Sequence, residues 1–150
     1  SHPWDFCELN DETVDMVQSL RSDYVKYVYS VPHTFFYDKG VGDVEKMLRY
    51  AGSDLSHVLI ADTRNHTKHC RYIVNPPGVD AVVHQHVGVG EGDVDFDALF
   101  RTLRDMKFAE QTFKVGGEPI VATSLFGYPE KMKYQAVETR ELIERELLRR

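Results

Sequence analysis

The chain has 150 residues and a formal net charge of −6, which fits a single domain spanning residues 1–150. An acidic balance without a stripe of lysines and arginines argues against a nucleic-acid-binding surface. The apolar stretches are too short to span a bilayer, and the first residues do not have the pattern expected of a signal peptide. Cys7 and Cys70 have no secretory context, so we expect reduced thiols in a cytoplasmic protein.

Apolar patterns along the chain predict alternating helices and strands. Near-continuous runs of β-branched, aromatic and aliphatic residues are typical of strands in a parallel sheet, and they occupy residues 24–31, 55–62 and 119–126. Apolar residues at helical spacing predict helices, which occupy residues 10–21, 41–52, 95–106 and 129–149. This alternation indicates the α/β class.

The predicted helices have recognisable boundary residues. Asn10 and Asp11 are expected to cap the first helix, and Asp95 the third. Gly52 is placed to close the second helix, because glycine readily adopts the left-handed conformation at a helix end. The predicted inward-facing residues are Val14, Val17, Leu20, Val44, Met47, Leu48, Ala51, Leu99, Phe100 and Leu103.

Three parallel strands make a poor closed domain, because such a sheet needs both faces covered and both edges protected. We therefore expect this chain to form the C-terminal part of a larger barrel. The expected partner is either a missing N-terminal half of the barrel or another copy of the chain in a homo-oligomer.

Four motifs resemble the xylose isomerase-like TIM barrels, a superfamily of sugar phosphate isomerases and epimerases. SHVLIAD (56–62) resembles the seventh strand of that family, and GEGDVDF (90–96) resembles its glycine loop and the start of the following helix. PHTFF (32–36) resembles the end of its sixth strand, with His33 in place. Residues 71–96 are most similar to the inositol-catabolism branch. The resemblance implies roughly the last three βα units of a (β/α)8 barrel, with the active site at the carboxyl ends of the strands.

The resemblance also implies a divalent metal, which isomerases of this family bind through two Glu, one Asp and one His. Here the aspartate position holds Ser30, the histidine position holds Leu59, and the last glutamate position holds about Ser124. Two functions stay open. The first is an isomerase or epimerase that moves a proton between adjacent carbons of a sugar or inositol-derived keto-sugar. The second is a non-catalytic sugar-binding or assembly subunit that has lost the metal shell.

Two histidines in VVHQHVG are candidate replacement ligands. In an extended segment His84 and His86 point to the same side, so they could bind one Mn, Co, Fe or Zn ion. Alternatively, both histidines pin a long loop by bonding its carbonyl groups. HTKHC (66–70) is a further ligand cluster whose spacing is common by accident.

The remaining candidates lie next to predicted strand ends. Proton transfer is assigned to His33, Glu8 and Asp5. Substrate binding is assigned to Trp4, His2, Asp62, Arg64 and Arg71. An aromatic ring could stack on a sugar, and an arginine could hold a phosphate or carboxylate. For Asp62, a buried ion pair with an arginine is the alternative.

The glycines of GVGEGDVDF do not follow a strand in the order of a dinucleotide-binding loop. We expect them to let the backbone turn back tightly before Asp95 begins a helix. The glycine half of the segment is therefore interpreted as architecture, and its histidine half as a candidate for chemistry.

Overall fold

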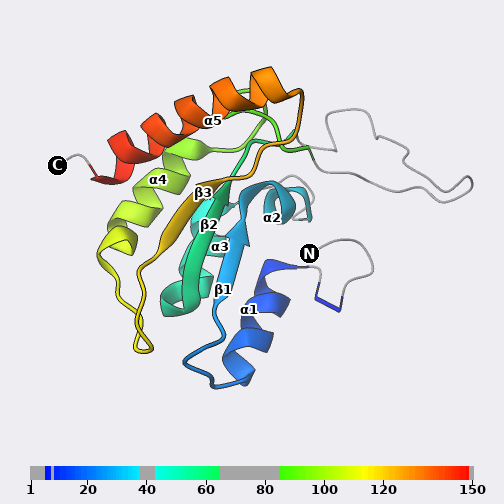
Figure 1. Ribbon diagram of the computed structural model, residues 1–150. Helices are drawn as coiled ribbons and strands as arrows, with labels where there is room; N and C mark the ends of the chain where they lie inside the picture. Colours follow the sequence, from blue (N-terminus) through cyan, green and yellow to red (C-terminus); the bar gives the residue numbers. More distant parts are fainter. Residues whose placement is uncertain (1–5, 8, 38–42, 65–84, 149–150) are drawn as a thin grey trace, which may run out of the picture.

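The computed structural model of the protein describes residues 6–7, 9–37, 43–64 and 85–148 (Figure 1). Its main elements are α1 (Asn10–Ser19), β1 (Tyr27–Ser30), α2 (Val31–Tyr37), α3 (Val44–Ala51), β2 (Leu55–Ile60), α4 (Phe96–Asp105), β3 (Ile120–Thr123) and α5 (Pro129–Ile143). Short helical turns follow three of the helices: η1 (Gly52–Asp54), η2 (Phe108–Glu110) and η3 (Glu144–Leu148). The described part of the chain contains no helix long and apolar enough to cross a membrane.

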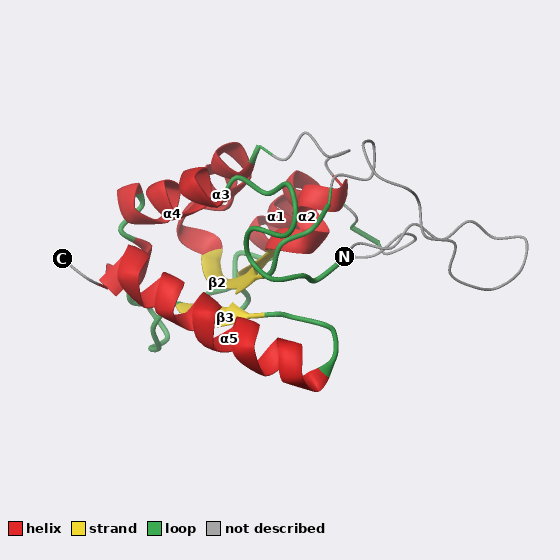
Figure 2. Ribbon diagram, turned by 90° about the horizontal axis from the view of Figure 1, so that it is seen from above, coloured by secondary structure: helices red, strands yellow, loops and turns green. Residues whose placement is uncertain are grey.

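The three strands form one parallel sheet in the order β1-β2-β3, which confirms the predicted α/β class. Helices α3 and α4 pack side by side, and α5 runs along β3 (Figure 2). Each connection between neighbouring strands contains helices, so the carboxyl ends of all three strands lie at the same edge. The arrangement is that of consecutive βα units from the wall of a TIM barrel.

The described helices cover one face of this sheet and leave the other face open. Tyr29, Val58 and Ile60 are completely buried beneath them. Val28 and Ile120 share a register row with His57 on the opposite face, where they are 44% and 48% exposed. In a TIM barrel the helices lie outside and the other face points into the interior. The open face of this sheet therefore corresponds to the interior of a barrel.

The predicted core positions are confirmed at every inward-facing residue but one. Leu48, Leu99 and Leu103 are fully buried in one cluster with residues of β1 and β2. Leu20 is the exception, because α1 ends at Ser19 and leaves the Leu20 side chain 55% exposed. A helical spacing predicts burial only as far as the helix continues.

Two predicted caps are confirmed and the first is wrong. The Asp95 carboxylate accepts a hydrogen bond from the Ala98 N–H (2.8 Å), and Gly52 closes α3 with a positive φ of 54°. At α1, however, Leu9 occupies the cap position. The Asn10 side chain instead accepts a hydrogen bond from the Tyr27 hydroxyl (2.8 Å), so a tertiary contact takes the group that was expected to cap the helix.

The strands are shorter than predicted, and β1 is shorter at both its amino and its carboxyl end. Tyr24 and Val25 are exposed and precede β1, although their residue types favour strands. After Ser30 the chain enters α2, whose second residue is Pro32. Proline is tolerated in the first turn of a helix because the N–H it lacks has no helical partner there. As a result, His33 lies in a helix directly above the end of β1.

Candidate functional site

Two histidines from distant parts of the chain meet at the carboxyl edge of the sheet. His33 lies in α2 after β1, and His86 lies in the segment between β2 and α4. Their Nε2 atoms are 3.2 Å apart, and the rings meet edge to face with centroids separated by 5.2 Å. His86 is 4% exposed, whereas His33 is half-buried. The pair therefore presents two imidazole nitrogens to one point at the strand ends.

Ser124, just beyond the end of β3, determines which nitrogen of His86 carries a proton. The Nδ1 atom lies 2.6 Å from the Ser124 carbonyl oxygen and 3.1 Å from its hydroxyl. A carbonyl oxygen can only accept, so Nδ1–H is the donor. In the neutral ring Nε2 then carries the lone pair that faces His33. This is the arrangement in which a histidine binds a metal or accepts a proton through Nε2.

The position of His86 depends on pairing between the two ends of the excursion that leaves β2. Asp62 and Val87 form an antiparallel bridge with backbone N–H···O distances of 2.9 and 3.0 Å. The Gln85 side-chain oxygen accepts from the Thr63 hydroxyl (3.2 Å) and from the backbone N–H of Arg64 (3.1 Å). Residues 85–87 are therefore held against the end of β2, which brings His86 to the strand edge.

The buried carboxylate of Asp62 organises the glycine loop. One of its oxygens accepts from the N–H groups of Gly90 and Gly92, both at 2.9 Å. The other accepts from those of Thr63 (2.8 Å) and Val94 (3.2 Å). Burial raises the pKa of this carboxyl, although the four backbone donors oppose that effect. Its hydrogen bonds are thus directed to loop backbone.

Gly92 has a steric reason to be glycine. A Cβ atom there would lie 2.5 Å from the Thr63 carbonyl oxygen and would also collide with the Asp62 carboxylate. The expectation that these glycines permit a tight turn before α4 is confirmed. Arg64 is exposed, and in the described structure no ion pair joins it to Asp62.

The histidine pair has a spacing that suits a shared metal ion. Two nitrogens bound to one tetrahedral zinc, each at about 2.0–2.1 Å, lie roughly 3.3 Å apart. The observed 3.2 Å separation fits this value. Within the described residues, however, no group of three or more His, Cys, Asp or Glu side chains is gathered to hold a metal. A metal held by this pair would therefore need further ligands from outside the described residues.

The positions at which the family resemblance implies an aspartate and a histidine carry other side chains. Ser30 and Leu59 are paired in the sheet register, with Ala122 next to Leu59 on β3. The Ser30 hydroxyl is buried and has no hydrogen-bond partner in the described part of the chain. A buried hydroxyl without a partner next to a functional edge is available to a ligand or water.

Several predicted site residues lie outside the described residues, and their assignments stay predictions: His2, Trp4, Asp5, Glu8, Arg71, His84 and the cluster at 66–70. Sequence reasoning missed Gln85 and Phe126. It considered Ser124 only as the residue that replaces a metal-binding glutamate of the family. The ring of Phe126 stacks on His86 with centroids 4.3 Å apart. Its position as the last residue of the predicted strand at 119–126 was the available signal.

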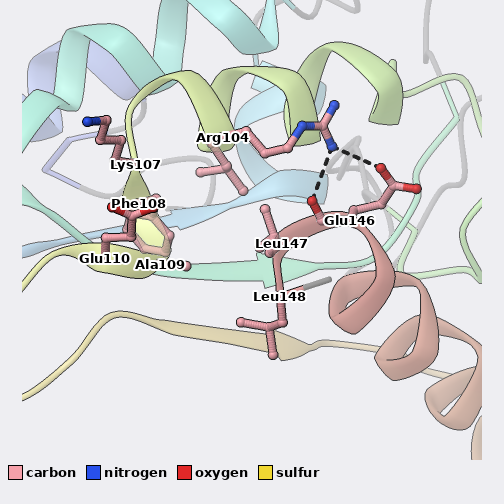
Figure 3. Close-up of a pocket in the computed structure, with 9 residues that line it drawn as sticks. Arg104, Lys107, Phe108, Ala109, Glu110, Glu146, Leu147 and Leu148 are labelled. Carbon is pink, nitrogen blue, oxygen red and sulfur yellow. Dashed lines mark hydrogen bonds and ion pairs between the residues drawn. The ribbon is translucent and has the colours of Figure 1, made fainter. Parts of the chain in front are cut away.

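A separate hollow of about 490 Å³ lies between the end of α4 and η3 (Figure 3). Leu103 and Phe108, both fully buried, form part of its wall. Arg104 points toward η3, where its guanidinium pairs with the Glu146 carboxylate at 2.9 Å. The Arg104 guanidinium is thus already paired with a carboxylate, and none of the described site residues predicted from the sequence lines this hollow. The histidine pair is the better candidate for chemistry.

Comparison with known proteins agrees with this architecture. The sequence profile of the family described as xylose isomerase-like TIM barrel matches residues 1–119. A solved structure of IolI protein with a binding zinc atom has a TM-score of 0.63 and 20% identity, covering 99% of this chain and 48% of its own. A xylose isomerase domain protein from Planctomyces limnophilus has a TM-score of 0.60 and 15% identity, covering 91% of this chain and 43% of its own. No curated protein matches.

At these identities the two solved structures show the fold alone. The chain spans less than half the length of either one.

Proposed function

Because the chain belongs to the xylose isomerase-like TIM barrel family, we propose that it contributes the last strand ends of a metal-dependent sugar isomerase or epimerase site. The substrate class is a small sugar, polyol or inositol-derived keto-sugar. The observation that carries the proposal is the 3.2 Å approach of the His33 and His86 Nε2 atoms at the carboxyl edge of the sheet. That edge is where TIM-barrel enzymes assemble their active sites.

His86 and His84 are the ligands expected from the sequence, and we now propose His33 as a ligand in place of its predicted role in proton transfer, because its Nε2 lies 3.2 Å from that of His86. The fit rests on the nitrogen spacing and on the proton at Nδ1 of His86, which leaves Nε2 free of hydrogen. Imidazole ligands suit Zn, Co or Fe, and Mn is retained from the family resemblance. The zinc of the IolI structure belongs to that protein, and at 20% identity it only makes zinc the first metal to test.

A divalent ion bound here would polarise a substrate carbonyl and make the neighbouring C–H more acidic. The chain's own groups would do the rest. Ser30 offers an unpartnered buried hydroxyl to a substrate oxygen, and Asp5 and Glu8 are the proposed proton carriers. When no metal is present, His33 can donate from Nε2 to the lone pair on His86, which keeps the pair together.

The second candidate is a non-catalytic sugar-binding or assembly subunit. Ser30, Leu59 and Ser124 favour it, because each replaces a ligand that the family resemblance implies. The open sheet face is also consistent with assembly, since Val28 and Ile120 remain exposed. In this case the expected partner is the complementary barrel half or a second copy of the chain.

Elemental analysis of the purified protein tests the proposal. We expect about one equivalent of Mn, Co, Fe or Zn per chain, strongly reduced in both His33→Ala and His86→Ala. His57→Ala is the matched control, because His57 lies on the same sheet and bonds Ser56 rather than the pair. Protein that takes up no metal even from excess would overturn metal dependence.

Turnover separates the two functions. Sugars and keto-inositols incubated in D2O with the metal-loaded protein should exchange the proton next to the carbonyl, as followed by NMR. The binding-subunit alternative instead expects a rise in melting temperature with ligand and no exchange. If the protein takes up metal but shows neither proton exchange nor ligand-dependent stabilisation with any of these sugars, the result argues against both functions.

A further inference from the structure

We infer that Phe126 is a positioning residue that holds the imidazole plane of His86. Its ring lies nearly parallel to that of His86, with an interplanar angle of 24° and centroids 4.3 Å apart. Its backbone N–H also donates to the His86 carbonyl oxygen at 3.0 Å. The main chain of Phe126 therefore binds the backbone carbonyl of His86, and its side chain contacts the imidazole ring.

Exposure makes this contact unusual. Phe126 is 73% exposed, so hydrophobic burial supplies little reason for its ring to lie where it does. Tyr128 is similarly exposed at 82%, but in the described structure its ring does not stack on His86. Of these two exposed aromatic residues, Phe126 is the one that stacks on the 4% exposed imidazole. Such aromatic pairs carry an orientation preference beyond the area they bury.

The stack supplies a restraint that the Ser124 hydrogen bond does not. The carbonyl of Ser124 fixes Nδ1 at 2.6 Å and selects the tautomer. A hydrogen bond at one atom still allows the ring to tilt about that atom. The Phe126 ring covers one imidazole face and restricts this tilt, so that Nε2 stays directed at His33. Together, Ser124 and Phe126 set both the tautomer of His86 and the direction of the Nε2 lone pair that faces His33.

The end of β3 in this chain contributes to the site differently from what the family resemblance implies. The resemblance implies a glutamate near Ser124, which would itself contact a metal. In this chain the segment after β3 instead acts through His86, at one step removed. The contacts of Ser124 and Phe126 with His86 are all formed without a metal. The proposed metal therefore serves here only as a probe of the geometry of His86.

The first test needs no metal. Long-range ¹H–¹⁵N NMR of the metal-free protein should show His86 protonated at Nδ1, with a single set of ring signals. In Phe126→Ala the proton should stay on Nδ1, because Ser124 selects the tautomer, but the ring signals should broaden or split as the ring tilts. Phe126→Tyr and the matched control Tyr128→Ala should keep the single set of ring signals. A single, sharp and unshifted set of His86 ring signals in Phe126→Ala would overturn the inference.

The second test uses Co²⁺ alone, followed by its visible absorption. Loss of an outer-shell partner weakens metal binding by roughly tenfold or more. We therefore expect Phe126→Ala to weaken Co²⁺ binding about tenfold and to change the band shape, with Phe126→Tyr restoring both. Equal affinities and spectra in Phe126→Ala and Tyr128→Ala would also count against positioning.

The two tests separate this inference from the proposed function. If the unaltered protein binds no Co²⁺, the metal-dependent function fails, whereas the NMR comparison still decides the role of Phe126. If Co²⁺ binds tightly but Phe126→Ala changes neither the His86 NMR signals nor the Co²⁺ affinity, the metal site stands and the positioning role is refuted.

Discussion

Asp62→Asn probes how strongly a single carboxylate holds the segment that leads into α4. The wild-type side chain accepts four backbone hydrogen bonds, two at each oxygen. Asparagine keeps one oxygen and replaces the other with an NH₂ group, which donates. Either orientation of the amide therefore leaves two loop N–H groups facing a donor.

The size of the effect follows from those two N–H groups. An unsatisfied buried donor costs about 1–3 kcal/mol, so two give roughly 2–6 kcal/mol. Gly90 is exposed, and water can replace its lost acceptor, which favours the lower end of the range. Removing a buried charge offsets a further part. We expect the free energy of unfolding to fall by about 2 kcal/mol.

Urea unfolding measures that free energy, and hydrogen exchange locates the loss at the amides of Gly90, Gly92 and Val94. Asp95→Asn is the matched control, because Asn and Asp cap helices about equally well and the Ala98 N–H keeps its acceptor. The reasoning is refuted if both substitutions cost the same, or if exchange at the three amides is unchanged in Asp62→Asn.

The same carboxyl predicts a pH dependence. Burial raises its pKa in the folded protein above the ordinary value of 3.8. The folded state then binds this proton more tightly than the unfolded state, so the contribution of Asp62 to stability is fullest below the ordinary pKa. It declines as pH rises through the raised pKa. The stability difference between wild type and Asp62→Asn, measured from acid to neutral pH, should follow that direction; a difference that grows with pH would contradict it.

Three other predictions concern packing and assembly. Gly92→Ala should destabilise by roughly 1–3 kcal/mol in urea unfolding, since its Cβ would meet backbone at 2.5 Å; a neutral effect would mean that the loop relaxes freely. Leu103→Ala should cost about 2–5 kcal/mol in the same assay because its side chain is fully buried, whereas Leu148→Ala, at an exposed position, should be nearly silent. The open sheet face predicts self-association in sedimentation velocity at high concentration, reduced in Ile120→Lys; a monomer at all concentrations would count against an incomplete barrel wall.

The sequence by itself determined the order and kind of the main described elements except α2, a helix that it did not predict. Periodicity and caps are local properties, so α3 and α4 begin and end close to where Asp95, Gly52 and the apolar stripes predict. Its motifs were also sufficient to identify the family. The first helix shows the limit of local reasoning, because Asn10 exchanged its capping role for a contact with Tyr27.

Only the tertiary structure decided the composition of the site. His33 and His86 are separated by 53 positions, and His86 and Ser124 by 38, so no spacing rule relates them. They meet because parallel pairing brings the strand ends to one edge and because the Asp62–Val87 bridge returns the chain to it. Asp62, predicted as a substrate contact, directs its oxygens to loop N–H groups for the same reason: backbone donors approach it only after the chain has folded back.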